Sequence, residues 1–333
     1  MSVPVIAFFN NKGGVGKTSL VYHVSWMLAE LGFRVVAADL DPQSNLTGVF
    51  LEDDKLELLW PEEEERLTIY GAVRPIKVGL GDISAPGLEP IASRLVLIPG
   101  DIALSEFEDD LSAAWPKCLD QDERAFRVMS AFWRVVQKGA AEHEADIVLV
   151  DLGPNLGAIN RAALIAADFV VIPLGPDLYS LQGMQNLGPR LREWRKGWNE
   201  RMQKKPASIG ELPSGNMTPL GYIVMQHSVR LDRPTKSYDR WIARIPGTYR
   251  KYVLDQRNGD SNSVTNDPNC LLLLKHFRSL MPMAQEARKP MFALKPADGA
   301  LGAHANAVLD ASASFRKLAN EITRRAGIVK SSA

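Results

Sequence analysis

The sequence predicts an α/β protein in which a mostly parallel sheet carries helices on both faces. Short, continuously apolar runs recur along the 333 residues, as is typical of strands that are covered on both sides. The clearest runs are residues 3–9, 35–38, 95–98, 147–150, 169–173 and 220–225. Stretches with apolar residues at helical spacing separate them. We expect one α/β domain over residues 1–333, with an added helical and loop segment at about 190–270.

A glycine-rich turn lies between the first apolar run and an apolar helix. Gly13, Gly14 and Gly16 allow the backbone to turn tightly and to point its N–H groups at phosphate oxygens. Lys17 is placed to reach the outer phosphates, and the Thr18 hydroxyl is placed to ligate Mg²⁺. The alternative, a chance glycine cluster beside a solvated lysine, fits this strand–loop–helix context poorly. The sequence therefore predicts a P-loop NTPase fold, with a nucleotide held by Gly13, Gly14, Val15, Gly16, Lys17, Thr18 and Ser19.

Carboxylates follow two of the other predicted strands. Asp39 and Asp41 come directly after the run 35–38, and Asp151 directly after the run 147–150. Ligands of α/β sheets bind at the carboxyl ends of the strands, so we expect these acids to lie beside the phosphate loop. Asp151 is then the expected partner of Mg²⁺, usually through water, although an aspartate at this place can also cap a helix.

Three motifs in the same order resemble the ParA/MinD family of partitioning ATPases, and most closely its ParA-like members. The loop with its second lysine, residues 12–18, looks like the deviant phosphate loop of that family. Residues 39–45 and 151–157 are similar to its two switch segments. The resemblance extends from Val3 to about Arg325, and the segment from Arg190 to Asn269 departs from it.

The resemblance implies a nucleotide-switched ATPase. It implies that Asp41 positions or activates the attacking water, that Asp39 supports the metal shell, and that Lys12 reaches across a dimer to the partner's nucleotide. The expected cofactors are ATP and Mg²⁺, with slow hydrolysis that a ParB-like or other protein stimulates. The expected output is an ATP-dependent homodimer that binds nonspecific DNA and positions DNA or another cargo. The alternative is an orphan ATP-dependent switch that binds protein, in cargo placement or in a defence or toxin system.

The zero net charge hides a segregation of charge along the chain. Residues 51–110 contain 15 Asp and Glu against 5 Lys and Arg. Residues 190–260 contain 15 basic against 7 acidic residues, and residues 271–333 contain 10 against 4. Basic segments fit a nucleic-acid partner, although any one cluster can be an ordinary solvated face. The two distant cysteines, Cys118 and Cys270, argue against a disulfide framework, and we expect a cytoplasmic protein without membrane contact, associated with the nucleoid if it binds DNA.

The remaining expectations concern single elements. Gln226, with His227, follows the run 220–225 and is the candidate to contact the base. Thr68 and Asp101 are expected to cap helices. Helices are also expected at Glu123–Lys138, beyond Gly188–Pro189, and at Ala303–Ala326, where the last carries Arg316, Lys317, Arg324 and Arg325. We further expect a solvated run at Glu62–Glu65, interruptions at Pro234 and Pro246, a mobile loop at 258–269, and a last strand at Leu280–Pro282.

Overall fold

The computed structural model describes residues 2–61, 66–226, 235–256, 263–277 and 279–330. Within these ranges a single sheet of eight strands has the order β3-β4-β2-β5-β1-β6-β7-β8. All neighbouring strands are parallel except β3, which is antiparallel to β4. The strands are β1 (Val5–Phe8), β2 (Val35–Asp39), β3 (Glu89–Ala92), β4 (Leu95–Ile98), β5 (Ile147–Asp151), β6 (Phe169–Leu174), β7 (Thr218–Gln226) and β8 (Cys270–Lys275).

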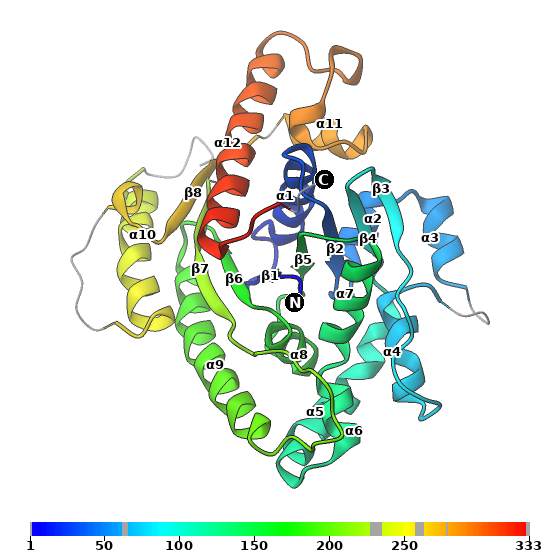
Figure 1. Cartoon of the computed structure of the whole chain (residues 1–333). Coiled ribbons are helices and arrows are strands. Elements are labelled where there is room, and N and C mark those ends of the chain that lie inside the picture. The colour runs from blue at the N-terminus through cyan, green and yellow to red at the C-terminus, as the bar shows by residue number, and fades with distance from the viewer. Residues whose placement is uncertain (1, 62–65, 227–234, 257–262, 278, 331–333) are drawn as a thin grey trace.

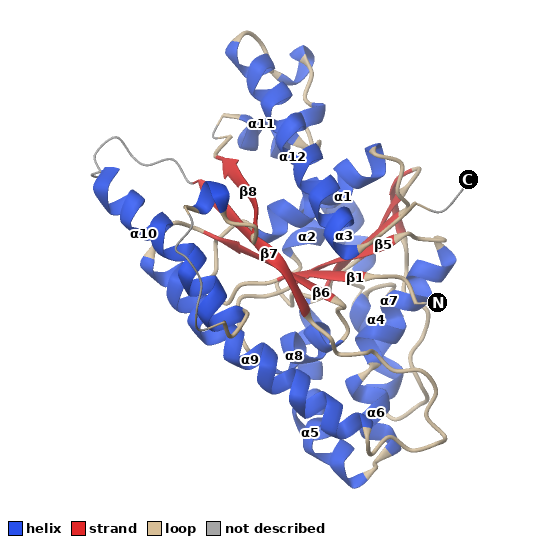
Figure 2. Ribbon diagram, turned by 60° about the vertical axis from the view of Figure 1, so that its left-hand side comes forward, coloured by secondary structure: helices blue, strands red, loops and turns tan. Residues whose placement is uncertain are grey.

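Helices cover both faces of the sheet, as Figures 1 and 2 show. One face carries α1 (Lys17–Glu30), α2 (Asn45–Phe50), α3 (Asp53–Leu59), α11 (Leu280–Glu286) and α12 (Ala303–Ala326). The other carries α4 (Ile69–Lys77), α5 (Glu108–Lys117), α6 (Glu123–Met129), α7 (Ala131–Glu142), α8 (Ala158–Ile165), α9 (Leu178–Met202) and α10 (Thr235–Thr248). The predicted α/β fold class is therefore confirmed.

Alternate residues of each central strand enter opposite hydrophobic cores. In β1, Val5 and Ala7 pack on the α7–α9 side, while Ile6 and Phe8 pack on the α1 and α12 side. All four side chains are fully buried. This explains why the strands read as continuous apolar runs, since neither face of the sheet meets water.

Several predicted boundaries are confirmed and others are wrong. The final helix, α12, has the predicted bounds, and Thr68 and Asp101 cap α4 and the 3₁₀ helix Ile102–Phe107. The helix predicted at Glu123–Lys138 is two helices, because the chain bends at Ser130, whose hydroxyl donates to the Phe126 carbonyl.

Two predicted proline breaks do not occur. The α9 helix continues through Gly188 and Pro189, so the helix expected beyond them begins at Leu178 instead. Gly188 serves packing, because a Cβ there would lie 1.9 Å from the Tyr252 carbonyl oxygen. Pro246 lies inside α10, which leads into a π-helical turn at Tyr249–Val253. Pro234 and the run Glu62–Glu65 lie outside the described residues.

The end of the sheet was also mispredicted. Leu280–Pro282 is the first turn of α11, where a proline is tolerated because its missing N–H would have no partner. The last strand is instead β8, a leucine run that pairs in parallel with β7. Within the predicted loop at 258–269, residues 263–269 include a 3₁₀ turn at Val264–Asn266 with Val264 buried, and 258–262 lie outside the described residues.

The described helices include none that is both long and apolar enough to cross a membrane. Cys118 and Cys270 are both free thiols, the first buried and the second partly so.

Candidate functional site

The glycine-rich turn links the end of β1 to the first turn of α1. Gly14 and Gly16 have φ angles of +69° and +88°, a left-handed conformation that favours glycine. A Cβ at Gly16 would also lie 2.9 Å from the Met225 methyl carbon. The turn delivers Lys17, Thr18 and Ser19 as the first residues of α1, at the positive end of the helix dipole. The local sequence thus builds the anion-binding cradle that it predicts.

Lys17 is held inside this turn by the turn's own backbone. Its ammonium group donates to the carbonyl oxygens of Asn10 at 3.1 Å and Lys12 at 3.3 Å. Its side chain is buried, and this burial lowers the pKa of Lys17, although the charges of Asp151 and Asp41 oppose the shift. Lys17 is therefore fixed beside the space that the turn encloses.

Asp39 and Asp151 lie next to each other at the carboxyl ends of β2 and β5, which are paired residue for residue at this point. Both are fully buried. Burial raises the pKa of each carboxyl above its usual range, and the charge of Asp39 raises that of Asp151 further. Thr18 and Lys17 oppose the shift at Asp151 only in part.

Both carboxylate oxygens of Asp151 are buried, and among the described residues neither has a well-formed hydrogen bond, although the Thr18 hydroxyl interacts with the carboxylate and lowers its pKa. Buried polar atoms are usually fully hydrogen-bonded, so this incompletely bonded carboxylate fits a bound cation or its water. Mg²⁺ is typically held by one or two carboxylates together with substrate phosphates. The residues present therefore fit Mg²⁺: Thr18 would be a direct ligand, and Asp151 and Asp39 would support the metal from behind it.

Asp41 faces the same space from the loop after β2. Its carboxylate accepts the Gln43 backbone N–H at 3.0 Å, and its own N–H donates to Asp39 at 3.2 Å. A Cβ at Gly153 would lie 2.9 Å from Asp41 Oδ1, so the glycine in the loop after β5 leaves room for this carboxylate. The two loops that resemble switch segments thus contact each other at Asp41 and Gly153.

Asp39 is fixed by residues that the sequence did not reveal. Thr47 donates both its backbone N–H and its hydroxyl to Asp39 Oδ2 at 2.8 Å. The same hydroxyl accepts the Gly100 N–H at 2.7 Å, and a Cβ at Gly100 would lie 2.8 Å from the Asp39 carboxyl carbon. Only the position of Thr47 in the first turn of a helix after the Asp41 loop could have suggested its role.

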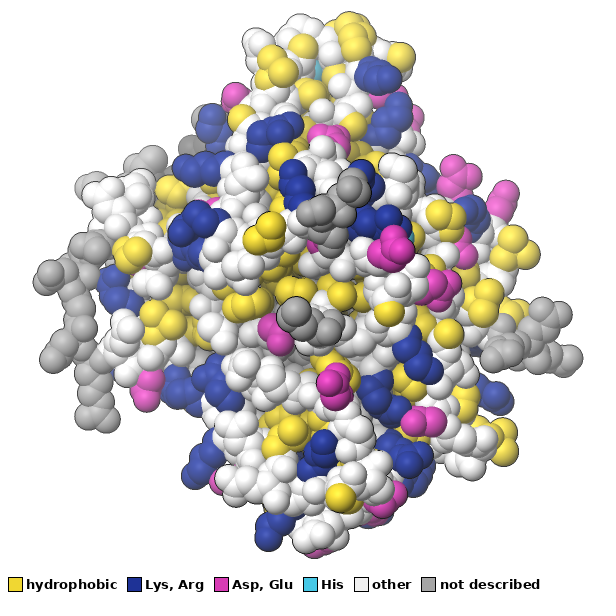
Figure 3. All heavy atoms as spheres, viewed as in Figure 1, with side chains coloured by type: hydrophobic (Ala, Val, Ile, Leu, Met, Phe, Trp, Pro, Cys, Tyr) yellow, Lys and Arg dark blue, Asp and Glu magenta, His cyan; other side chains and the backbone are white. Residues whose placement is uncertain are grey.

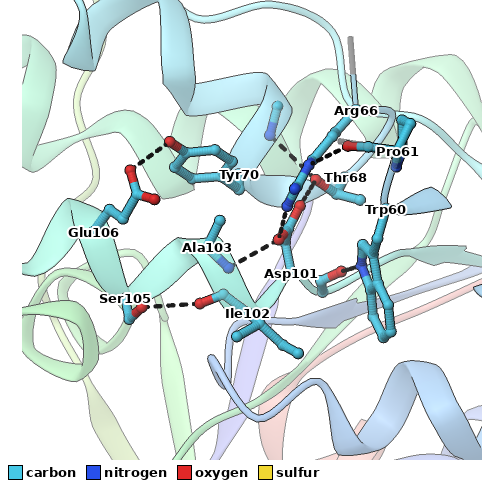
Figure 4. A network of polar contacts seen from close by, with 12 residues as sticks. Trp60, Pro61, Arg66, Thr68, Tyr70, Asp101, Ile102, Ala103, Ser105 and Glu106 are labelled. Atoms are coloured by element: carbon cyan, nitrogen blue, oxygen red, sulfur yellow. Dashed lines mark hydrogen bonds and ion pairs between the residues drawn. The ribbon is translucent and has the colours of Figure 1, made fainter. Parts of the chain in front are cut away.

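Figure 4 shows how this contact continues toward the surface. The Trp60 indole donates to the Gly100 carbonyl at 3.0 Å. The next residue, Asp101, is fully buried and accepts from Arg66 and from the Thr68 hydroxyl, both at 2.8 Å. The segment that follows α3 is thereby connected by hydrogen bonds to the carboxylate pair.

A cavity of about 480 Å³ opens over the phosphate loop and Asp41. Tyr22 and His23 of α1 and Met281 and Gln285 of α11 form its far wall. Burial lowers the pKa of His23 to about 4, so this wall is uncharged at neutral pH. Gln226 ends β7 opposite Lys275 of β8, but its side chain and all of His227 lie outside the described residues.

Lys12 points away from this cavity. Its ammonium group forms an ion pair with Asp177, the N-cap residue of α9, at 2.6 Å, and lies 5.9 Å from the centre of the Tyr179 ring. Lys12 and Asp177 are each about one third exposed. The structure therefore brings together every predicted loop residue and the three acids, but directs the Lys12 side chain outward.

Comparison with known proteins assigns the chain to a family. A family model described as an AAA domain (AAA_31) matches residues 3–204, which is more than half of the chain. The chain belongs to this family. The Chromosome partitioning protein ParA of Myxococcus xanthus is 32% identical over 200 residues, which are 59% of this chain and 60% of that protein. The ParA-like resemblance is thereby confirmed.

The AAA-domain chain spans less than two thirds of the curated relatives it matches, from 37% to 66% of their lengths. Solved structures cover more of it. Protein DIP2308 from Corynebacterium diphtheriae superposes with a TM-score of 0.72 at 22% identity, covering 97% of this chain and 99% of that one. McdA from Cyanothece, in complex with ATP, gives 0.64 at 16% identity and covers 100% and 99%. At these sequence identities the similarity shows a shared fold and no more.

Proposed function

We propose that this ParA-like chain binds and slowly hydrolyses MgATP, dimerises when ATP is bound, and uses the dimer to bind DNA without sequence preference and so position a cargo. The observation that carries the proposal is that Lys17 and Asp41 line one cavity over a phosphate loop, with the buried carboxylate of Asp151 close enough for its charge to act on Lys17. The complex of the structural neighbour McdA with ATP supports the choice of nucleotide.

Each residue contributes a different part of the chemistry. The loop N–H groups and Lys17 hold the phosphates, and the metal, when bound, neutralises the charge that develops on them. Thr18 and the Asp39–Asp151 pair hold the metal. Asp41 accepts a hydrogen bond from the attacking water and orients it, since phosphoryl transfer depends on positioning and electrostatics more than on covalent help. Residues at the cavity wall, Gln285 among them, contact the base, together with Gln226 at the end of β7.

Lys12 is the candidate to act in the dimer. It is not needed by its own nucleotide, because Lys17 already occupies the inside of the loop. Its ion pair with Asp177 is partly exposed, and such pairs contribute only about 0–1 kcal/mol, so it can be exchanged for a phosphate of a facing subunit at little cost. A buried pair of nucleotides needs such cations between them.

An exposed basic surface that could contact DNA lies on α12. Arg316 and Lys317 are exposed there, and Figure 3 shows basic side chains along this face. Arg324 and Arg325 instead both bind Glu321. The arginines of α9 are less available to DNA than the sequence suggested, because two of them are hydrogen-bonded within the protein. Arg192 donates to the Tyr252 carbonyl and Arg195 to the Asn216 and Met217 carbonyls.

DNA binding in the presence of ATP tests the proposal. The double reversal Arg316→Glu/Lys317→Glu should weaken binding and reduce the salt slope by about 2, since each phosphate contact contributes about 0.9. The matched control is Arg124→Glu/Arg127→Glu on α6, across the sheet, which should leave binding unchanged. If the wild type forms an ATP-dependent dimer that does not bind DNA, the function of the dimer is to bind a protein instead. A ParB-like activator and a location on the nucleoid are part of the same proposal.

A further inference from the structure

A second cavity lies between α5, α8 and α9, which pack together below the sheet in Figure 2. It has a volume of about 480 Å³ and shares no lining residue with the cavity over the phosphate loop. Trp115 of α5, Arg161 of α8, and Trp194 and Arg201 of α9 form its walls. It is thus a separate, polar and cationic hollow on the other face of the sheet.

Two guanidinium groups pack against one indole in this cavity. The guanidinium carbon of Arg201 lies 3.6 Å from the centre of the Trp115 ring, and that of Arg161 lies 4.6 Å from it. A Cβ at Gly197 would lie 2.9 Å from the same ring, so the glycine lets α9 approach Trp115. Arg201 also donates to the carbonyls of Trp115 and Gly197. These contacts hold the two cations in fixed positions.

Neither guanidinium has a counter-ion among the described residues, since no carboxylate lies within 4.0 Å of Arg161 or Arg201. The other cations at the rim do have partners. Arg190 pairs with Glu193 at 2.7 Å and Lys196 with Glu200 at 3.9 Å. Glu108 and Glu193 act on Arg161, and Glu200 acts on Arg201, only from beyond ion-pair distance. The cations without a direct ion pair are therefore in the wall, where Arg201 is only 6% exposed, and not at the rim.

Arg161 is also short of hydrogen bonds. Its Nη2 donates to the Leu111 carbonyl at 3.2 Å, but its Nε is buried without a partner. Burial and the charge of Arg201 lower the pKa of Arg161 to about 10, so it remains charged at neutral pH. A partly buried charge that has no ion pair and is not fully hydrogen-bonded is costly, and a bound anion would reduce that cost.

We propose that this cavity is a binding site for a carboxylate or phosphate group, held by the forked guanidiniums of Arg161 and Arg201 beside Trp115. Arginine suits this task because its planar set of N–H donors matches both anions in a bidentate manner. The group can be carried by a free anion or by the acidic side chains of a partner protein. The site does not depend on nucleotide binding.

Tryptophan indole resonances report on the site directly. In the ¹⁵N-labelled full chain the Trp115 indole N–H signal is assigned by its loss in Trp115→Phe. The protein is then titrated at constant ionic strength with sodium phosphate, with sodium succinate, and with a capped tetraglutamate peptide, against sodium chloride as the reference. Arg161→Gln removes the proposed fork, and Arg190→Gln at the rim, where Glu193 already satisfies the arginine, is the matched control.

We expect a saturable shift of the Trp115 signal, retained in Arg190→Gln and weakened about 10- to 100-fold in Arg161→Gln, the loss typical of a charge-assisted hydrogen bond. Saturation by phosphate or succinate identifies a site for a free anion. Saturation by the peptide alone identifies a site for an acidic protein segment. The proposal is overturned if no probe produces a saturable shift beyond that of chloride, or if Arg161→Gln responds as the wild type does.

Discussion

Replacing Thr47 by valine tests how firmly the metal-facing carboxylate is held. The substitution preserves the shape of a fully buried side chain but removes the hydroxyl that donates to Asp39 and accepts from Gly100. A lost hydrogen bond to a charged group costs about 1.5–3 kcal/mol, and an unsatisfied buried N–H about 1–3 kcal/mol. Allowing for relaxation, we expect the free energy of unfolding at pH 8 to fall by about 3 kcal/mol.

The loss should also depend on pH. The Thr47 hydrogen bonds favour the ionised form of Asp39 and lower its pKa, against the upward effect of burial. Because the folded-state pKa of Asp39 remains above the unfolded value, its charge carries no penalty below about pH 4, and stability falls as pH rises through the folded-state pKa. Thr47→Val raises that pKa further, so its cost should be larger at pH 8 than at pH 5.

Urea unfolding of the nucleotide-free protein at both pH values measures this effect. Thr47→Ser is the control, since it retains the hydroxyl and loses one methyl group, worth about 1 kcal/mol. A loss in Thr47→Val no greater than that of the serine variant, or one that is equal at pH 5 and pH 8, would refute the reasoning.

Three further predictions concern the same site. In the nucleotide-free state Asp151→Asn should be more stable than the wild type, by a margin that grows as pH rises from 5 to 8, because the raised pKa of Asp151 marks a carboxylate that is costly to ionise; thermal unfolding at each pH measures this margin. The same variant should lose Mg²⁺-dependent hydrolysis in a phosphate-release assay. Asp41→Ala should retain ATP binding and lose about 10²–10⁴-fold in turnover, and activity within twofold of wild type would remove Asp41 from the mechanism. Lys17→Ala should fail to bind nucleotide, which calorimetry measures.

The sequence predicted the centre of the molecule well because local chemistry determines it. Parallel strands end at one edge of a sheet, so Asp39 and Asp151 were expected beside Lys17, and β2 and β5 bring the two acids side by side. The turn glycines are similarly local, since Gly14 and Gly16 adopt the positive φ that the motif requires.

Contacts between distant segments could not be predicted in this way. The ion pair of Lys12 with Asp177 spans 165 residues, and the bond of Gly100 with Thr47 spans 53. Proline positions misled for the same reason. Gly188 and Pro189 suggest a helix boundary, but the glycine admits the Tyr252 carbonyl, a contact that appears only once the segment after α10 is folded against α9.

The dimer is the central claim, and Lys12→Ala tests it most directly. Light scattering of the wild type with Mg²⁺ and a nonhydrolysable ATP analogue should give twice the monomer mass of 36.7 kDa, whereas the variant should bind the analogue equally well and remain at the monomer mass. Asp177→Asn serves as the control, because it releases Lys12 from its ion pair without removing the lysine. A variant Lys12→Ala that dimerises with normal strength would contradict the account.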